Sequence, residues 1–174
     1  MRISSVKNPI YNRTIHPTYN RSINPTYNRT INPIYNRTIN PIYNRTISPI
    51  YNHTISPIYN RTINPVYNRT INPIYNRTIN PVYNRTINPT YNSNFNGLFM
   101  FDLNANLLEY AVLSDNIILF FNLKDEFLRF GVRHSMNGYV MFSSDNNYIG
   151  HLENNSQSGY NYFDDNSKWT AFIS

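Results

Sequence analysis

The feature that most constrains this chain is a proline that recurs every eight residues. It belongs to an octapeptide, Asn-Pro-Ile-Tyr-Asn-Arg-Thr-Ile, which is written roughly eleven times between Asn8 and Asn92. The prolines stand at positions 9, 17, 25, 33, 41, 49, 57, 65, 73, 81 and 89. Proline at this spacing removes a backbone donor and clashes with the preceding helical turn, so a continuous α-helix is excluded.

Each octapeptide is expected to contain a tight turn followed by a short extended piece. Asn-Pro-x-Tyr has the residues typical of a β-turn, and the remaining β-branched and aromatic residues favour extended backbone. Two arrangements fit this pattern: an extended, turn-rich arm, or a β-solenoid in which the octads stack. Stacking would place arginines about 4.8 Å apart, with no acid in the arm to neutralise them.

Charge divides the chain into two segments. Residues 1–95 contain eleven Lys or Arg and no Asp or Glu, whereas residues 96–174 contain four basic and nine acidic residues. All eleven prolines lie in the first segment and all five glycines in the second. We therefore expect an N-terminal lead over 1–7, a repeat arm over 8–95 and a separate domain over 96–174.

The second segment contains a hidden repeat of about 20 residues, anchored on Phe101, Phe121, Phe142 and Phe163. Each unit is an apolar run, a polar loop of five residues (DLNAN, NLKDE, SSDNN or DDNSK) and a second apolar run. This pattern is typical of a β-hairpin. The sequence thus predicts an all-β fold with a C-terminal antiparallel meander of four hairpins, with units near 97–115, 116–137, 138–158 and 159–174.

The apolar residues of the hairpins predict how the sheet is buried. One face of the second strands is expected to carry Leu108, Tyr110, Val112, Leu128, Phe130, Val132, Ile149 and Phe172. The first strands are apolar on both faces, which a one-sided sheet does not require. Closure into a small barrel, folding over into a sandwich, or association with another chain would each hide the second face.

Catalytic motifs are lacking in this sequence. It has no cysteine, no Gly-x-Ser-x-Gly, no P-loop and no His-Glu-x-x-His. His151 and Glu153, with His134, form the best acid–base candidate, because residues two apart on a strand share a face. His151 nevertheless occupies the slot of an aromatic in the other hairpins, so a core histidine is expected. The Asp and Asn of the loops are good turn residues. We expect no enzyme, no cofactor and no metal.

Two sets of residues are candidates for binding. The first is the arginines of the octads, which could contact an anion or nucleic acid with the interleaved tyrosines: Arg13, Arg21, Arg29, Arg37, Arg45, Arg61, Arg69, Arg77 and Arg85. The second is a predicted aromatic ligand platform: Tyr139, Tyr148, Tyr160, Tyr162 and Trp169. In addition, Asn-Pro-x-Tyr resembles the turn motif recognised by phosphotyrosine-binding domains, and the Asn-Arg-Thr triplets match the N-glycosylation acceptor pattern.

These observations favour a non-enzymatic repeat protein. In the first hypothesis, the arm is a spacer, stalk or assembly element, and the C-terminal domain interacts with a protein partner or with itself. In the alternative, the arm binds an anion, an anionic surface or nucleic acid. No signal peptide and no run of about 20 apolar residues is visible, so we expect no transmembrane segment and a cytoplasmic location by default.

Overall fold

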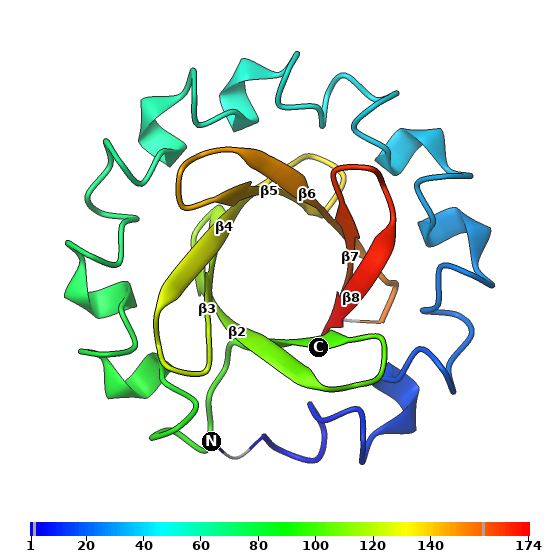
Figure 1. Cartoon of the computed structure of the whole chain (residues 1–174), viewed down its shortest axis with the longest axis horizontal. Coiled ribbons are helices and arrows are strands. Elements are labelled where there is room, and N and C mark those ends of the chain that lie inside the picture. Colours follow the sequence, from blue (N-terminus) through cyan, green and yellow to red (C-terminus); the bar gives the residue numbers. More distant parts are fainter. Residues whose placement is uncertain (2, 158) are drawn as a thin grey trace.

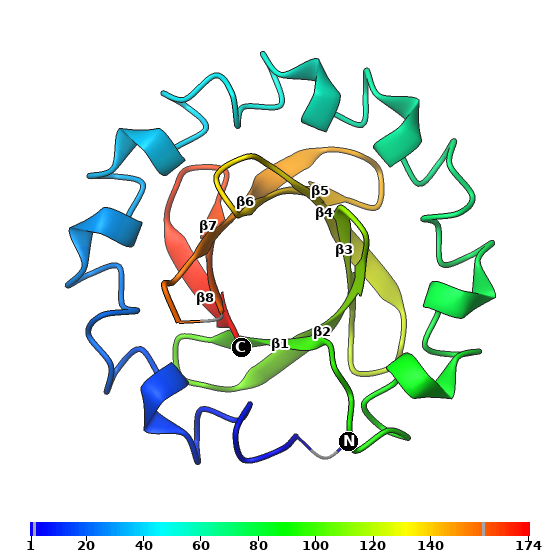
Figure 2. The same cartoon turned by 180° about the vertical axis from the view of Figure 1, so that it is seen from behind.

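The structure, a computed structural model, describes residue 1, residues 3–157 and residues 159–174. Arg2, in the expected lead, and Ser158, in the third hairpin unit, lie outside the described residues. The fold is a closed β-barrel surrounded by a ring of turns (Figure 1). The C-terminal segment forms the barrel and the octapeptide arm forms the ring, as the reverse view in Figure 2 also shows.

The barrel is built from eight antiparallel strands in chain order. They are β1 (Leu98–Asp102), β2 (Leu107–Ser114), β3 (Ile117–Phe121), β4 (Phe127–Arg133), β5 (Tyr139–Ser143), β6 (Tyr148–Asn154), β7 (Tyr160–Asp164) and β8 (Trp169–Ile173). The all-β class and the antiparallel hairpins are confirmed, and of the three expected ways to hide the second face the structure has closure into a barrel. β8 pairs with β1, where Phe172 lies opposite Phe101. Closure removes both sheet edges and gives the first strands two buried faces.

A β-bulge interrupts every hairpin near its anchor phenylalanine. In the first hairpin Met100 pairs with Glu109 and Phe101 with Leu107, which leaves Leu108 without a partner residue. The same register shift occurs in the other three hairpins. An extra residue breaks the alternation of side chains. The face predicted for the second strands was therefore wrong at three positions. Leu108 and Leu128 are exposed, and Ile149 packs against the apolar cluster inside the barrel.

The four hairpin loops share one backbone geometry. In each loop the fourth residue has a left-handed backbone, with φ between 61° and 67°: Ala105, Asp125, Asn146 and Ser167. The first residue of each loop accepts a hydrogen bond through its side chain, as Asp102 Oδ1 does from the backbone N–H of Asn104 and Asn106. Asp, Asn and Ser are therefore placed in these loops by turn geometry.

The arm consists of consecutive turns, and it is neither extended nor stacked. It contains seven single-turn 3₁₀ helices: η1 (Arg13–Ile15), η2 (Arg29–Ile31), η3 (Arg37–Ile39), η4 (His53–Ile55), η5 (Arg61–Ile63), η6 (Arg77–Ile79) and η7 (Arg85–Ile87). None of the described residues before Leu98 lies in a strand, and no helix in the described part of the chain is long enough to cross a membrane. The arm instead follows the outside of the barrel (Figure 1).

Asparagine side chains tie neighbouring octads together. The side chain of Asn36 caps η3 by accepting from Thr38 N–H and Thr38 Oγ1–H, and its amide donates to Thr30 O of the preceding octad at 2.6 Å. Asn40 accepts from Ile42 N–H and donates to Pro33 O at 3.0 Å. Because both amides reach back into the preceding octad, the repeat joins its neighbours without a β-sheet ladder.

The same octad spacing sets which side chains face the barrel. The proline and the residue before it are buried in most octads, and the last isoleucine is buried or half-buried, whereas the residue after proline, the tyrosine and the arginine are exposed. Ile55 belongs to one apolar cluster with Phe121, Phe130 and Phe142 of the barrel, and further arm isoleucines pack against it. The arm therefore covers the outer face of the barrel, and the two segments share a core.

Polar contacts close the ring of turns where its two ends meet. Lys7 Nζ donates to Gly97 O at 2.6 Å and to Phe95 O at 3.3 Å, and Ser174 Oγ donates to Lys7 O at 2.9 Å. Burial lowers the pKa of Lys7. These bonds tie the start of the arm to the barrel and to the end of the chain.

Candidate anion-binding interface

The nine arginines of the octads form a regular array on the outside of the ring. Each guanidinium lies over the ring of the tyrosine six residues later, which belongs to the next octad, at 4.8–5.1 Å from the ring centroid. We call these pairs the Arg–Tyr belt. They are Arg13–Tyr19, Arg21–Tyr27, Arg29–Tyr35, Arg37–Tyr43, Arg45–Tyr51, Arg61–Tyr67, Arg69–Tyr75, Arg77–Tyr83 and Arg85–Tyr91.

Local structure explains why the arginines point outward. Most of them, such as Arg37, are the first residue of a 3₁₀ turn whose Asn cap fixes the backbone, while the last residue of the turn faces the barrel. All nine arginines are exposed, and residues 1–95 contain no carboxylate that could neutralise them. The sequence analysis named these nine arginines as candidate anion contacts, and the structure places each one over a tyrosine. The pairing was not predicted, although the constant spacing of six residues could have suggested it.

One octad carries a histidine in place of the arginine and keeps the stacking. His53 lies over Tyr59 with the two ring centroids 3.9 Å apart and the ring planes 20° apart. The position thus retains a flat, nitrogen-bearing group on the tyrosine face where the guanidinium is missing.

The five aromatics of the predicted platform do not come together. Tyr139, Tyr160 and Tyr162 pack with the cluster inside the barrel, and Tyr148 packs with the outer cluster. Trp169 lines a groove of about 410 Å³ with Pro25 and Ile34 of the arm and with residues of the β7–β8 loop. The predicted platform residues are therefore divided between the inside of the barrel, its outer face and a groove beside the arm.

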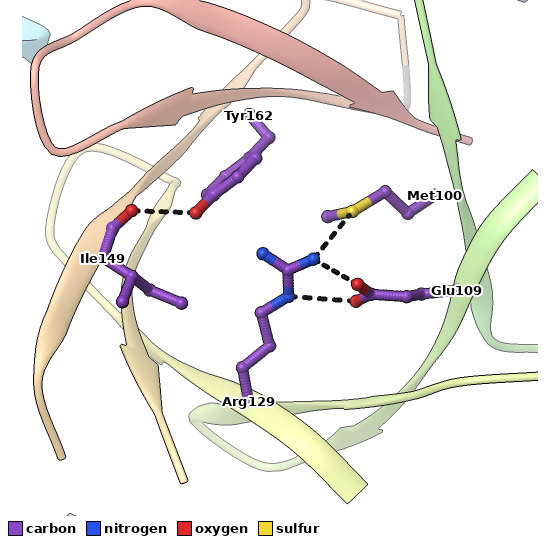
Figure 3. Close-up of polar contacts among 5 residues, drawn as sticks. All are labelled: Met100, Glu109, Arg129, Ile149 and Tyr162. Atoms are coloured by element: carbon purple, nitrogen blue, oxygen red, sulfur yellow. Dashed lines mark hydrogen bonds and ion pairs between the residues drawn. The ribbon is translucent and has the colours of Figure 1, made fainter. Parts of the chain in front are cut away.

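A buried ion pair lies inside the barrel, as Figure 3 shows. Arg129 donates through Nε and Nη2 to the carboxylate of Glu109, and its guanidinium lies 5.2 Å from the Tyr162 ring centroid. Burial acts to lower the pKa of Arg129, but the Glu109 carboxylate has the larger, opposite effect. The net result is a raised pKa. Sequence reasoning missed this pair. Its signal was the opposite charge at corresponding positions of two hairpins, 20 residues apart.

The acid–base candidate lies on the covered face of the barrel. His151 and Glu153 share a strand face, and Glu153 Oε1 lies 3.4 Å from His134 Nε2. His151 is fully buried and stacks on Phe163, with ring centroids 5.3 Å apart, as expected for a core histidine. Burial lowers the pKa of His151 to about 3, and burial raises the pKa of Glu153. Neither group is open to a substrate, so this cluster offers no catalytic geometry.

The described part of the chain contains no group of three or more His, Asp or Glu side chains arranged to hold a metal ion. Comparison with family models, with curated proteins and with solved structures finds no match to this chain. The class is therefore defined by the fold and its surface: an eight-stranded antiparallel barrel encircled by an octapeptide ring with a basic, aromatic exterior.

Proposed function

We propose that this chain is a non-enzymatic binding protein that holds a polyanion on the Arg–Tyr belt. The observation that supports the proposal is the combination of nine exposed guanidinium groups at one octad position and an arm, residues 1–95, that contains no carboxylate. Guanidinium is the cation best matched to phosphate and sulfate, because its planar fork makes paired hydrogen bonds. A repeated weak contact of this kind sums along a polymeric ligand.

Packing of the arm favours this hypothesis over the spacer or stalk. A spacer needs an arm that reaches away from the domain it carries, whereas Ile23 and Ile47 are buried to 1% and 0% exposure. Each such side chain stabilises the wrapped state by about 1.5–3 kcal/mol. Copy number would then set how many charged positions surround the barrel.

A protein partner is the second candidate function, and one observation favours it. Beside the belt, most octads expose the aliphatic residue that follows the proline, including Ile34, Ile50 and Val66 at 64%, 72% and 58% exposure. Extended apolar surface of this kind marks interaction sites. Self-association through the barrel is less favoured, because β1–β8 close on themselves and the arm covers their outer face.

Salt-dependent binding tests the polyanion proposal. The affinity of the full chain for fluorescently labelled heparin would be measured by anisotropy over a range of salt concentrations. We expect the logarithm of the affinity to fall linearly with the logarithm of salt concentration, as release of counterions requires. A salt-independent affinity, or no binding at low salt, would contradict the proposal.

A charge-matched pair of variants locates the site. Arg37, Arg45 and Arg61 would be replaced by Gln in one variant, and Lys124, Arg133 and Lys168 by Gln in the other. Both variants lose three positive charges, but only the first loses them from the belt. The belt variant should bind more weakly and with a salt slope reduced by about 2–3. Equal losses in the two variants would mean that net charge alone drives binding.

A further inference from the structure

The belt offers an open aromatic surface beside every cation. Tyr11, over which none of the described arginines lies, is 75% exposed, and the ten tyrosines that carry an arginine or histidine are 57–64% exposed. The stacked cation therefore covers only a small part of each ring. More than half of every tyrosine remains open to a second flat group.

The ligand chemistry follows from this pairing. A sulfated polysaccharide has no π-face to place on tyrosine, and a duplex keeps its bases stacked on one another inside. Only a single strand presents unstacked bases together with a phosphate at each step. A guanidinium placed over a ring still has N–H groups for phosphate oxygens. One octad therefore supplies both contacts that one nucleotide requires.

Rigidity of the octads adds to the argument. The Asn36 and Asn40 side chains are fixed by hydrogen bonds of 2.6–3.1 Å to their own octad and to the preceding one. The tyrosines are held on turns that are bonded at both ends, as in Tyr43 N–H to Asn40 O at 3.0 Å. Ligand binding would thus require little ordering of the backbone, which lowers its entropic cost.

We infer that the Arg–Tyr belt binds single-stranded nucleic acid, with the backbone following the ring and bases stacked on the open tyrosine faces. This inference rests on the proposed polyanion binding and narrows its ligand. Binding is independent of sequence, because every base has a π-face and the belt presents the same groups in each octad.

The test compares two probes and two variants of the full chain. The probes are a labelled oligodeoxythymidine long enough to cross several octads, and labelled heparin. In one variant Tyr35, Tyr43 and Tyr51 are replaced by Leu, which removes the aromatic faces and keeps every arginine. In the matched control Ile34, Ile42 and Ile50 are replaced by Thr, the residue found at the same octad position in Thr18, Thr26 and Thr90.

We expect the tyrosine variant to bind the oligonucleotide at least about ten-fold more weakly and to retain its affinity for heparin. The control should bind both probes like the parent chain, and duplex DNA should compete less well than the single strand. Tyrosine emission should be quenched by the oligonucleotide and not by heparin. Circular dichroism would establish that each variant remains folded.

The outcomes separate this inference from the function on which it rests. If the tyrosine variant binds both probes like the parent, or loses both equally, base stacking is excluded while polyanion binding stands. If neither probe binds the parent chain, both proposals fail. Loss of oligonucleotide binding in the isoleucine control as well would show that the belt recognises the probe through aliphatic contact, which also overturns the inference.

Discussion

At the scale of single residues, burial divides the isoleucines of the arm into two groups with opposite roles. Ile47 is the last residue of its octad and has no exposed surface, whereas Ile50 follows the next proline and is 72% exposed. The two residues have the same side chain and lie three positions apart. They therefore form a matched pair for testing whether the arm is packed on the barrel.

We expect Ile47→Ala to lower the free energy of unfolding by about 3 kcal/mol, because it removes a buried side chain and leaves a cavity. Ile50→Ala should change it by less than about 0.5 kcal/mol. Urea denaturation followed by circular dichroism measures both. Equal, small effects would mean that the arm does not lie against the barrel in solution.

His151 provides a residue-scale prediction of pH dependence. Its pKa falls from 6.5 to about 3 in the folded chain because of burial, so the folded state holds the neutral form. Below pH 6.5 His151 is protonated in the unfolded chain but stays neutral in the folded chain. The free energy of unfolding therefore falls as the pH drops toward 3. Between pH 7 and pH 5 this residue alone should cost about 2 kcal/mol.

The variant His151→Phe isolates this contribution. Tyr110, Phe130 and Phe172 fill the corresponding slot of the other hairpins, so the phenylalanine should fit. We expect the gain in unfolding free energy to be larger at pH 5 than at pH 7. Glu153 acts in the opposite sense, since its raised pKa destabilises the fold as pH rises above 4.5, and it remains in both proteins. A pH-independent gain would contradict the assignment to His151.

At the scale of the element, the octad depends on an amide that links neighbouring turns. Asn40 is 3% exposed and donates to Pro33 O. Ser48 and Ser56 occupy the same octad position and are equally buried. Asn40→Ser should therefore cost about 1 kcal/mol, the net value of one hydrogen bond. Asn40→Asp should cost more, because it buries a carboxylate against a carbonyl oxygen.

Thermal or urea unfolding of both Asn40 variants at neutral pH gives the comparison. If both variants are as stable as the parent chain, the amide link between octads contributes nothing to the free energy of unfolding.

The same scale shows what the sequence could and could not predict. The hairpins were predictable, because the anchors at Phe101 and Phe121 and the five-residue loops are local signals. Leu108 and Leu128 were misplaced because the bulge that exposes them depends on pairing with the adjacent strand. Closure through Phe101 and Phe172, and the path of the arm around the barrel, join residues far apart in the chain, and no local pattern encodes them.

The candidate binding residues divide in the same way. The nine arginines were predictable from the repeat alone, but their orientation over tyrosines required the turn geometry of the octad. The aromatics of the predicted platform are separated in the structure, since Tyr148 packs with the outer cluster and Tyr162 with the cluster inside the barrel.

At the scale of the whole molecule, the barrel depends on the arm to cover its outer face. Leu119, Phe121, Phe130 and Phe142 are buried in a cluster that includes arm isoleucines. We expect residues 96–174 expressed alone to expose a large apolar patch, to bind a hydrophobic dye strongly and to aggregate. Cleaving the full chain at the exposed Ser93–Asn94 link is the control, since it leaves these contacts in place and should leave dye binding low.

Small-angle X-ray scattering of the full chain tests the wrapped arrangement directly. A compact chain of 174 residues should have a radius of gyration of about 16 Å. An arm in polyproline-like geometry would instead span on the order of 270 Å and dominate the scattering curve. A compact particle whose radius does not change with concentration supports the ring, and places all nine arginines on one closed surface. A large radius would mean that the arm does not lie against the barrel. The Arg–Tyr pairs would then lack a fixed backbone, and the spacer hypothesis would be favoured.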